Sequence, residues 1–160
     1  MYTCQCEPGY SGSNCQIACP TGDPKYKMIK DTCYYYENTR MNYETAEENC
    51  ALKFSGGFIA EPKTVKVNDL LYAESKRQFA GGRSMTLWIG IGYSDSKSNF
   101  IYKSNNQIID IGVWADKTST YRKRSETTYC GTWYYGKWYH NMRCVLNMES
   151  ICQSTYRFVS

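Results

Sequence analysis

The 160-residue sequence contains little of what metal sites and hydrolases use: one histidine, four prolines and no Cys-x-x-Cys pair. Thiolate metal sites usually combine several His with paired Cys-x-x-Cys, and hydrolytic triads place a His beside a nucleophile, so neither is expected. No apolar run approaches the roughly 20 residues of a membrane-spanning helix. The first residues lack the charged and apolar regions of a secretory signal peptide, and no Asn-x-Ser/Thr sequon is present. We therefore expect neither an enzyme nor a membrane span in this sequence.

Cysteines and aromatic residues are abundant instead. The chain has nine cysteines, together with 16 Tyr, 5 Phe and 4 Trp, and it is 42% hydrophobic and 21% charged. This composition is typical of a folded domain with enough apolar area to bury. Many cysteines with almost no histidine favour disulfides, and disulfides require an oxidising compartment. An extracellular location follows, and a nucleic-acid partner is not expected there.

The first cysteines form a short motif. The sequence CQCEPGYSGSNC, residues 4–15, resembles the last third of an EGF-like module, and we assign residues 1–17 to such a fragment. The resemblance implies a Cys6–Cys15 disulfide, with the partner of Cys4 upstream of Met1. Cys4 would then be unpaired by truncation, which explains the odd cysteine count. The alternative is a small disulfide hairpin of no particular family.

Hydrophobic periodicity predicts two helices followed by strands. Asn42 is placed to cap a first helix that Gly56-Gly57 would end. A second helix is predicted over about 64–79, with inward side chains Val67, Leu70, Leu71 and Phe79. Strands are predicted at 87–92 and 99–102, and a hairpin within 130–144 turns at Gly136-Lys137. Helices followed by strands favour an α+β fold.

Several signals occur in a characteristic order: CPTG, CYYY, a helix ending in AEENC, LWIGI, and then Cys, Trp and Cys. In this order they resemble a long-form C-type lectin-like domain over residues 18–155, which leaves 156–160 as a tail. The resemblance implies two helices flanking small antiparallel sheets, a long irregular loop, and core tryptophans at Trp88, Trp114 and Trp138. It also implies the disulfide pairs Cys19–Cys33, Cys50–Cys152 and Cys130–Cys144.

Sugar-binding members of this family hold calcium through a Glu-Pro-Asn or Gln-Pro-Asp triplet, a following Glu, and an Asn-Asp pair. After Trp114 this chain has no proline, and Thr128 stands at the usual acidic position, with Glu126 two residues earlier. The Asn-Asp pair is replaced by Tyr139-His140 or His140-Asn141, depending on the alignment. Calcium gains affinity from carboxylates. We therefore predict that the sugar-coordinating calcium site is absent and that no cofactor is needed, although Asp110, Asp116 and Glu126 leave a weak structural ion open.

The formal charge of +4 lies wholly in residues 115–143, which hold six basic and two acidic residues. The resemblance makes this segment the ligand face. The residues predicted to bind ligand are Lys117, Tyr121, Arg122, Lys123, Arg124, Trp133, Tyr134, Lys137, Tyr139, His140 and Asn141. Cations suit sulfates or carboxylates, and aromatic rings suit sugars or protein partners. We predict recognition of an anionic glycan, and the alternative is docking of an extracellular protein on the Tyr/Trp-rich hairpin. An ordinary solvated loop at 121–124 is equally open.

Overall fold

The computed structural model describes residues 10–11, 17–20, 22–30, 32–79, 86–111 and 129–157, without the side chains of 10, 11, 17, 18, 141 and 155–157. Its helices are α1 (Tyr43–Lys53) and α2 (Val65–Gln78). Its strands are β1 (Tyr10–Ser11), β2 (Ile17–Ala18), β3 (Tyr26–Ile29), β4 (Thr32–Met41), β5 (Phe58–Ile59), β6 (Thr86–Trp88), β7 (Ile91–Ser94), β8 (Asn99–Tyr102), β9 (Tyr129–Tyr134), β10 (Lys137–Arg143) and β11 (Met148–Arg157). The α+β fold class expected from the sequence is confirmed.

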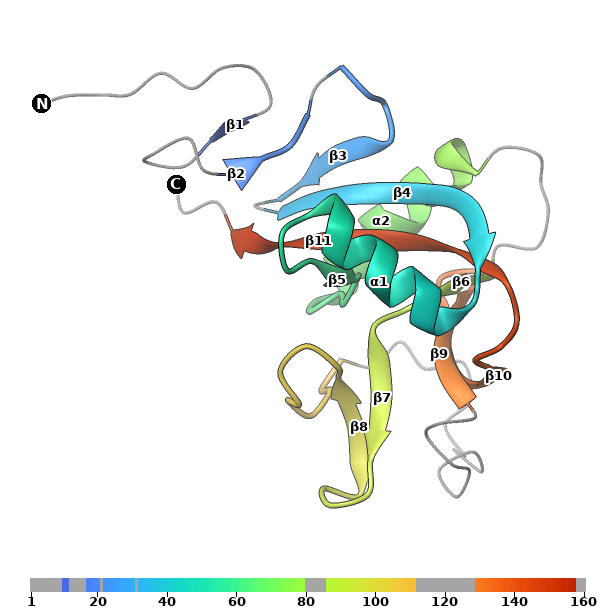
Figure 1. Ribbon diagram of the computed structural model, residues 1–160. Coiled ribbons are helices and arrows are strands. Elements are labelled where there is room, and N and C mark those ends of the chain that lie inside the picture. The colour runs from blue at the N-terminus through green and yellow to red at the C-terminus, as the bar shows by residue number, and fades with distance from the viewer. Residues whose placement is uncertain are drawn as a thin grey trace, which may run out of the picture.

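The main sheet has the strand order β10-β9-β6-β11-β4-β3, and β5 also pairs with β11. In Figure 1, α1 lies in front of the β4–β11 pair and α2 lies behind it. The sheet is mixed rather than purely antiparallel as expected, because β6 runs parallel to β11. The antiparallel pair β7–β8 forms a separate small sheet that projects from the main one.

The first helix begins at the predicted capping residue Asn42, and the second begins beside Thr64, at the predicted start of the helix, with Thr64 as its cap. The Oδ1 atom of Asn42 accepts a hydrogen bond from the Thr45 N–H at 2.9 Å, and Thr64 Oγ1 accepts from the Val67 N–H at 3.1 Å. These bonds satisfy N–H groups that a helix leaves unpaired in its first turn. The predicted inward position of Leu70 is wrong, since its side chain is 40% exposed, and α2 instead buries the polar Asn68 beside Leu71.

Disulfides connect distant parts of the described chain. The pairs Cys19–Cys33, Cys50–Cys152 and Cys130–Cys144 are present, as the family resemblance implied. The second pair joins α1 to β11 across 102 residues, and closing a loop of that length stabilises the fold by roughly 4–5 kcal/mol in the chain-entropy model. Cys4, Cys6 and Cys15 lie outside the described residues, so the implied Cys6–Cys15 pair, the unpaired Cys4 and the EGF-like assignment stay predictions.

The predicted strand over 87–92 is interrupted where the chain leaves the main sheet. Gly90 separates β6 from β7, and a Cβ atom at this position would clash with the backbone carbonyl of Ile59. Only glycine permits so close a backbone approach. After the interruption, β7 and β8 project away from the main sheet, and β7 packs beside β9 (Figure 1).

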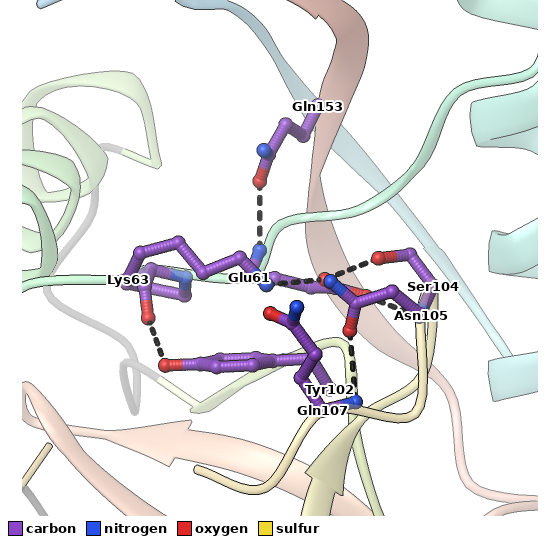
Figure 2. Close-up of polar contacts among 8 residues, drawn as sticks. Glu61, Lys63, Tyr102, Ser104, Asn105, Gln107 and Gln153 are labelled. Carbon is purple, nitrogen blue, oxygen red and sulfur yellow. Dashed lines mark hydrogen bonds and ion pairs between the residues drawn. The ribbon is translucent and has the colours of Figure 1, made fainter. Parts of the chain in front are cut away.

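A buried carboxylate ties the β7–β8 sheet to the segment before α2. Glu61 is 1% exposed, and its carboxylate pairs with Lys63 Nζ at 3.0 Å and accepts bonds from the N–H and hydroxyl of Ser104 at 2.7 and 2.6 Å. Figure 2 shows these contacts, with Gln153 accepting from the Glu61 N–H at 2.9 Å. Tyr102 adds a hydrogen bond to the Pro62 carbonyl at 2.9 Å. A buried charge is stable only when paired and hydrogen-bonded in this way.

Candidate functional site

The β9–β10 hairpin has two faces of different chemistry. Its register pairs Tyr134 with Lys137, Trp133 with Trp138, and Thr132 with Tyr139. Because side chains alternate along a strand, Tyr134, Lys137 and Tyr139 lie on one face and the two tryptophans lie on the other. The tryptophan face therefore packs into the core, and the face with Tyr134, Lys137 and Tyr139 is available to a ligand at the end of the hairpin.

The tryptophan face is held by a single buried side chain of α2. Asn68 is fully buried, and its Oδ1 accepts hydrogen bonds from the indole N–H groups of Trp133 at 2.6 Å and Trp138 at 2.8 Å. Its Nδ2 donates to the Gly136 carbonyl at 3.0 Å in the hairpin turn. The prediction that Trp133 contacts ligand is wrong, because this side chain is 0% exposed and is bonded to Asn68. Trp138 is a core residue, as expected.

The opposite face of the hairpin end carries exposed aromatic rings. Tyr134 is 43% and Tyr135 is 53% exposed, and their rings meet edge to face with centroids 4.6 Å apart. Tyr139 lies next to them, at 6.0 Å between ring centroids from Tyr134. The exposed Lys137 is paired with Tyr134 across the strands. Such rings give rigid contact area at a small cost in conformational entropy.

Two residues of α2 extend this surface and were not found from the sequence. The ring of Tyr72 lies under the hairpin turn, 3.2 Å from where a Cβ on Gly136 would stand, and Lys76 Nζ lies 4.7 Å from its centroid. Burial and the neighbouring Tyr135 raise the pKa of Tyr72 above its ordinary value. No local pattern links α2 to a hairpin about 60 residues later. We call Tyr72, Tyr134, Tyr135 and Tyr139, with Lys76 and Lys137, the tyrosine surface.

His140 does not belong to the tyrosine surface. It is 4% exposed, and its ring lies 5.4 Å from that of Phe100 on β8. Burial lowers the pKa of His140 to about 4, and the positive charge of Lys103 acts in the same direction. The imidazole is therefore neutral near pH 7. Its burial beside Phe100 separates it from Tyr134 and Tyr139, with which it is predicted to bind ligand.

The remaining predicted ligand-binding positions are the basic loop residues and one asparagine side chain. Lys117, Tyr121, Arg122, Lys123 and Arg124 lie outside the described residues, as does the side chain of Asn141. Trp114, Asp116 and Glu126 also lie outside them, so the absence of the sugar-coordinating calcium site stays a prediction. Within the ranges that the structure describes, no three His, Cys, Asp or Glu side chains are grouped to hold a metal ion. Neither α1 nor α2 has the length and apolarity of a membrane-crossing helix.

The fold and the disulfides together define a class of protein. A mixed sheet with one helix on either side, a disulfide from α1 to the last strand, and a second disulfide beside the β9–β10 hairpin make this a C-type lectin-like domain. The family model described as the lectin C-type domain matches residues 39–154, which is more than half of the chain. The chain therefore belongs to the C-type lectin domain family.

Solved structures of the same fold are similar at low sequence identity. Human lithostathine superposes with a TM-score of 0.69 at 15% identity, over 86% of this chain and 100% of that one. The mouse scavenger receptor C-type lectin carbohydrate-recognition domain gives 0.65 at 20% identity, over 86% and 98% of the two chains. The C-type lectin CEL-I from Cucumaria echinata gives 0.67 at 17% identity, over 84% and 96%. At these identities the likeness shows the fold alone.

Proposed function

We propose that this domain is an extracellular recognition module that binds a glycan carrying anionic groups, without a sugar-coordinating calcium ion. The observation that carries the proposal is the tyrosine surface, where exposed rings and two lysines lie together on a hairpin fixed by Asn68. Sugars stack on aromatic rings, and ammonium groups bind sulfates or carboxylates through charge-assisted hydrogen bonds. The family is generally non-enzymatic, and we propose a binding role rather than a catalytic one.

The basic segment gives further support for an anionic ligand. Residues 115–143 contain the whole formal excess of +4, and Lys137 of the tyrosine surface is part of that segment. A local excess of positive charge raises the concentration of an anionic ligand at the surface and speeds its association. Among the structural relatives, one is a carbohydrate-recognition domain and another is a complex with GlcNAc. These relatives support a glycan as the class of ligand to propose for this chain as well.

The proposal that ligand binding is independent of calcium rests on the residues found at the positions of the family's calcium ligands. The positions of the family's calcium ligands carry no proline-containing triplet, and neither alignment after Trp138 supplies a carboxylate. Calcium binds through six to eight oxygen ligands, with carboxylates giving most of the affinity. A chelator should therefore leave ligand binding unchanged.

A protein ligand is the second candidate. The Tyr134–Tyr135 pair is exposed, rigid and close to a cation, and these are the residue types that dominate the energy of protein interfaces. In this case the domain would act as a matrix or cell-surface adhesion module, preceded by the EGF-like fragment at residues 1–17. The many disulfides suit the extracellular location that either candidate requires.

Heparin chromatography separates the two candidates. We expect retention that survives chelator, falls with salt, and is reduced by Lys137→Ala and by changing Arg122, Lys123 and Arg124 together to Ala. Lys66→Ala is the matched control, since Lys66 is also exposed but lies in the first turn of α2, at the opposite end of the helix from Lys76. A glycan array with and without chelator then identifies the ligand. Absence of retention, or equal retention of every variant, would contradict anionic glycan binding and leave the protein partner.

A further inference from the structure

A separate pocket of about 580 Å³ lies between the first turns of α1, the β7–β8 sheet and the ends of β9 and β10. Its volume is within the range of ligand-binding sites in proteins. The tyrosine surface contributes none of its lining residues. We call it the α1 pocket and define it by Glu44 and Glu47 of α1, Tyr93 and Lys103 of the β7–β8 region, Tyr129 and His140.

The wall of the α1 pocket contains a buried polar group that the fold does not use. His140 is 96% buried, and its Nδ1 atom has no hydrogen-bond partner among the described residues. An unsatisfied buried polar atom costs about 1–3 kcal/mol, so most such atoms in native proteins have a partner or a function. Since the imidazole is neutral near pH 7, its Nδ1 atom is either a hydrogen-bond donor or an acceptor, according to the tautomer. A polar ligand that reaches this ring recovers part of that cost.

The charges of the α1 pocket argue against an anion. Glu47 pairs with Lys103 at 3.3 Å, and Lys103 Nζ also lies 4.6 Å from the centroid of the Tyr43 ring. Glu44 is exposed and has no ion-pair partner in the part of the chain that the structure describes. The two carboxylates outnumber the one cation, so a sulfate would be repelled. A bound divalent metal is equally disfavoured, because the described residues include no group of three metal-ligating side chains.

The pocket combines hydrogen-bonding groups with aromatic and apolar walls. The carboxylates accept hydrogen bonds from hydroxyl groups, and Lys103 donates them. The Tyr93 ring is half-buried and is held edge to face against Phe100 with centroids 5.2 Å apart, so it presents a fixed surface. Ile91 and Ile101 complete the apolar part of the lining. Alternating acceptors and donors beside an aromatic ring match a polyhydroxylated ring with apolar C–H faces.

We infer that the α1 pocket is a second binding site, which takes one uncharged hexose unit without any metal ion. Hydroxyl groups of the sugar donate to Glu44 and Glu47, Lys103 donates to a hydroxyl oxygen, and the sugar ring packs against Tyr93. The choice of a sugar as the ligand class rests on the proposed glycan recognition. The existence of the pocket and the charges that line it are independent of that proposal. The two sites would hold different parts of one glycan, the anionic part on the tyrosine surface and the uncharged unit in the pocket.

The single histidine of the chain gives a direct readout. In the full chain, the ring resonances of His140 are the only imidazole signals, and they can be followed by NMR during titration with uncharged methyl glycosides of glucose, galactose and mannose. We expect at least one glycoside to shift these signals, with a Kd on the order of 1 mM. Glu44→Gln should weaken that binding about tenfold, the loss for one hydrogen bond to a charged group. Glu48→Gln is the matched control, since Glu48 is exposed on the same helix and does not line the pocket.

The glycoside titration and heparin retention test the two sites separately. If no glycoside shifts the His140 signals, or if Glu44→Gln and Glu48→Gln bind equally well, the inference is wrong. Because Glu44 is exposed, its replacement is not expected to prevent folding, and an unchanged amide spectrum would confirm this. Lys137→Ala should reduce heparin retention and leave the glycoside titration unchanged. Failure of heparin binding with intact glycoside binding would overturn the proposed anionic ligand alone, and the reverse result would overturn the pocket alone.

Discussion

Replacing Asn68 with alanine should strongly destabilise the domain, because one side chain joins α2 to both strands and the turn of the hairpin. The change removes the acceptor of the buried indole N–H groups of Trp133 and Trp138 and the donor to the partly buried carbonyl of Gly136. Each unsatisfied buried group costs about 1–3 kcal/mol, and the lost volume adds to this. The better helix propensity of alanine returns only about 0.5 kcal/mol. We expect the free energy of unfolding to fall by about 4 kcal/mol, a large part of the 5–15 kcal/mol typical of a domain.

Urea unfolding with intact disulfides, followed by tryptophan fluorescence, measures this loss. Asn147→Ala is the control, since Asn147 is exposed in the turn between β10 and β11 and should change stability by less than about 0.5 kcal/mol. Asn68→Asp sharpens the test, because a carboxyl oxygen still accepts from both indoles, whereas only the protonated acid can donate to Gly136. Burial raises the pKa of such an acid, so the destabilisation relative to wild type should be smaller near pH 5 than near pH 7. A loss for Asn68→Ala no larger than that for Asn147→Ala would refute the reasoning.

Two further predictions concern other buried positions. The pKa of His140 is lowered to about 4 in the folded chain, against about 6.5 in the unfolded chain. Between about pH 6.5 and pH 4 the unfolded chain therefore binds a proton on this imidazole that the folded chain does not. The free energy of unfolding should drop by up to about 3 kcal/mol between these two pH values. His140→Phe should remove this part of the pH dependence in urea titrations, and parallel curves for the two proteins would contradict it. Gly131→Ala places a methyl group against the Ile91 side chain and should cost about 1–3 kcal/mol. The Gly131→Ala, Ile91→Ala double variant should lose less free energy of unfolding than the sum of the losses of the two single variants. Additive losses would show that the added methyl group does not clash with the Ile91 side chain.

The sequence predicted the helices well because their signals are local. Asn42 and Thr64 cap their helices through bonds to residues three positions on, and glycines follow where α1 ends. Leu70 was misplaced because periodicity alone counts an apolar residue as inward and a polar one as outward. In α2 the inward position belongs to Asn68, whose burial depends on two indoles more than 60 residues away.

The ligand face was harder to predict for a related reason. Adjacent aromatic residues 133–135 give no alternation of polar and apolar character, so the sequence cannot say which rings face inward. The hydrogen bond from Trp133 to Asn68 fixes that choice and turns Tyr134 outward. Tyr72 and Lys76 join the same surface only because α2 packs under the hairpin turn. The separation of His140 from these tyrosines follows equally from tertiary packing.

The opposite charges of the two candidate sites have a consequence for the salt dependence of binding. The tyrosine surface carries Lys76 and Lys137, while the α1 pocket carries Glu44 and Glu47 against Lys103. Interactions between exposed charges are screened over about 8–10 Å at physiological ionic strength, whereas hydrogen bonds and stacking to an uncharged sugar are not. A glycan that uses both sites should therefore lose only part of its affinity as salt is raised, and Glu44→Gln should lower the affinity that persists at high salt. A uniformly sulfated chain would lose nearly all of its affinity, because the carboxylates exclude it from the pocket.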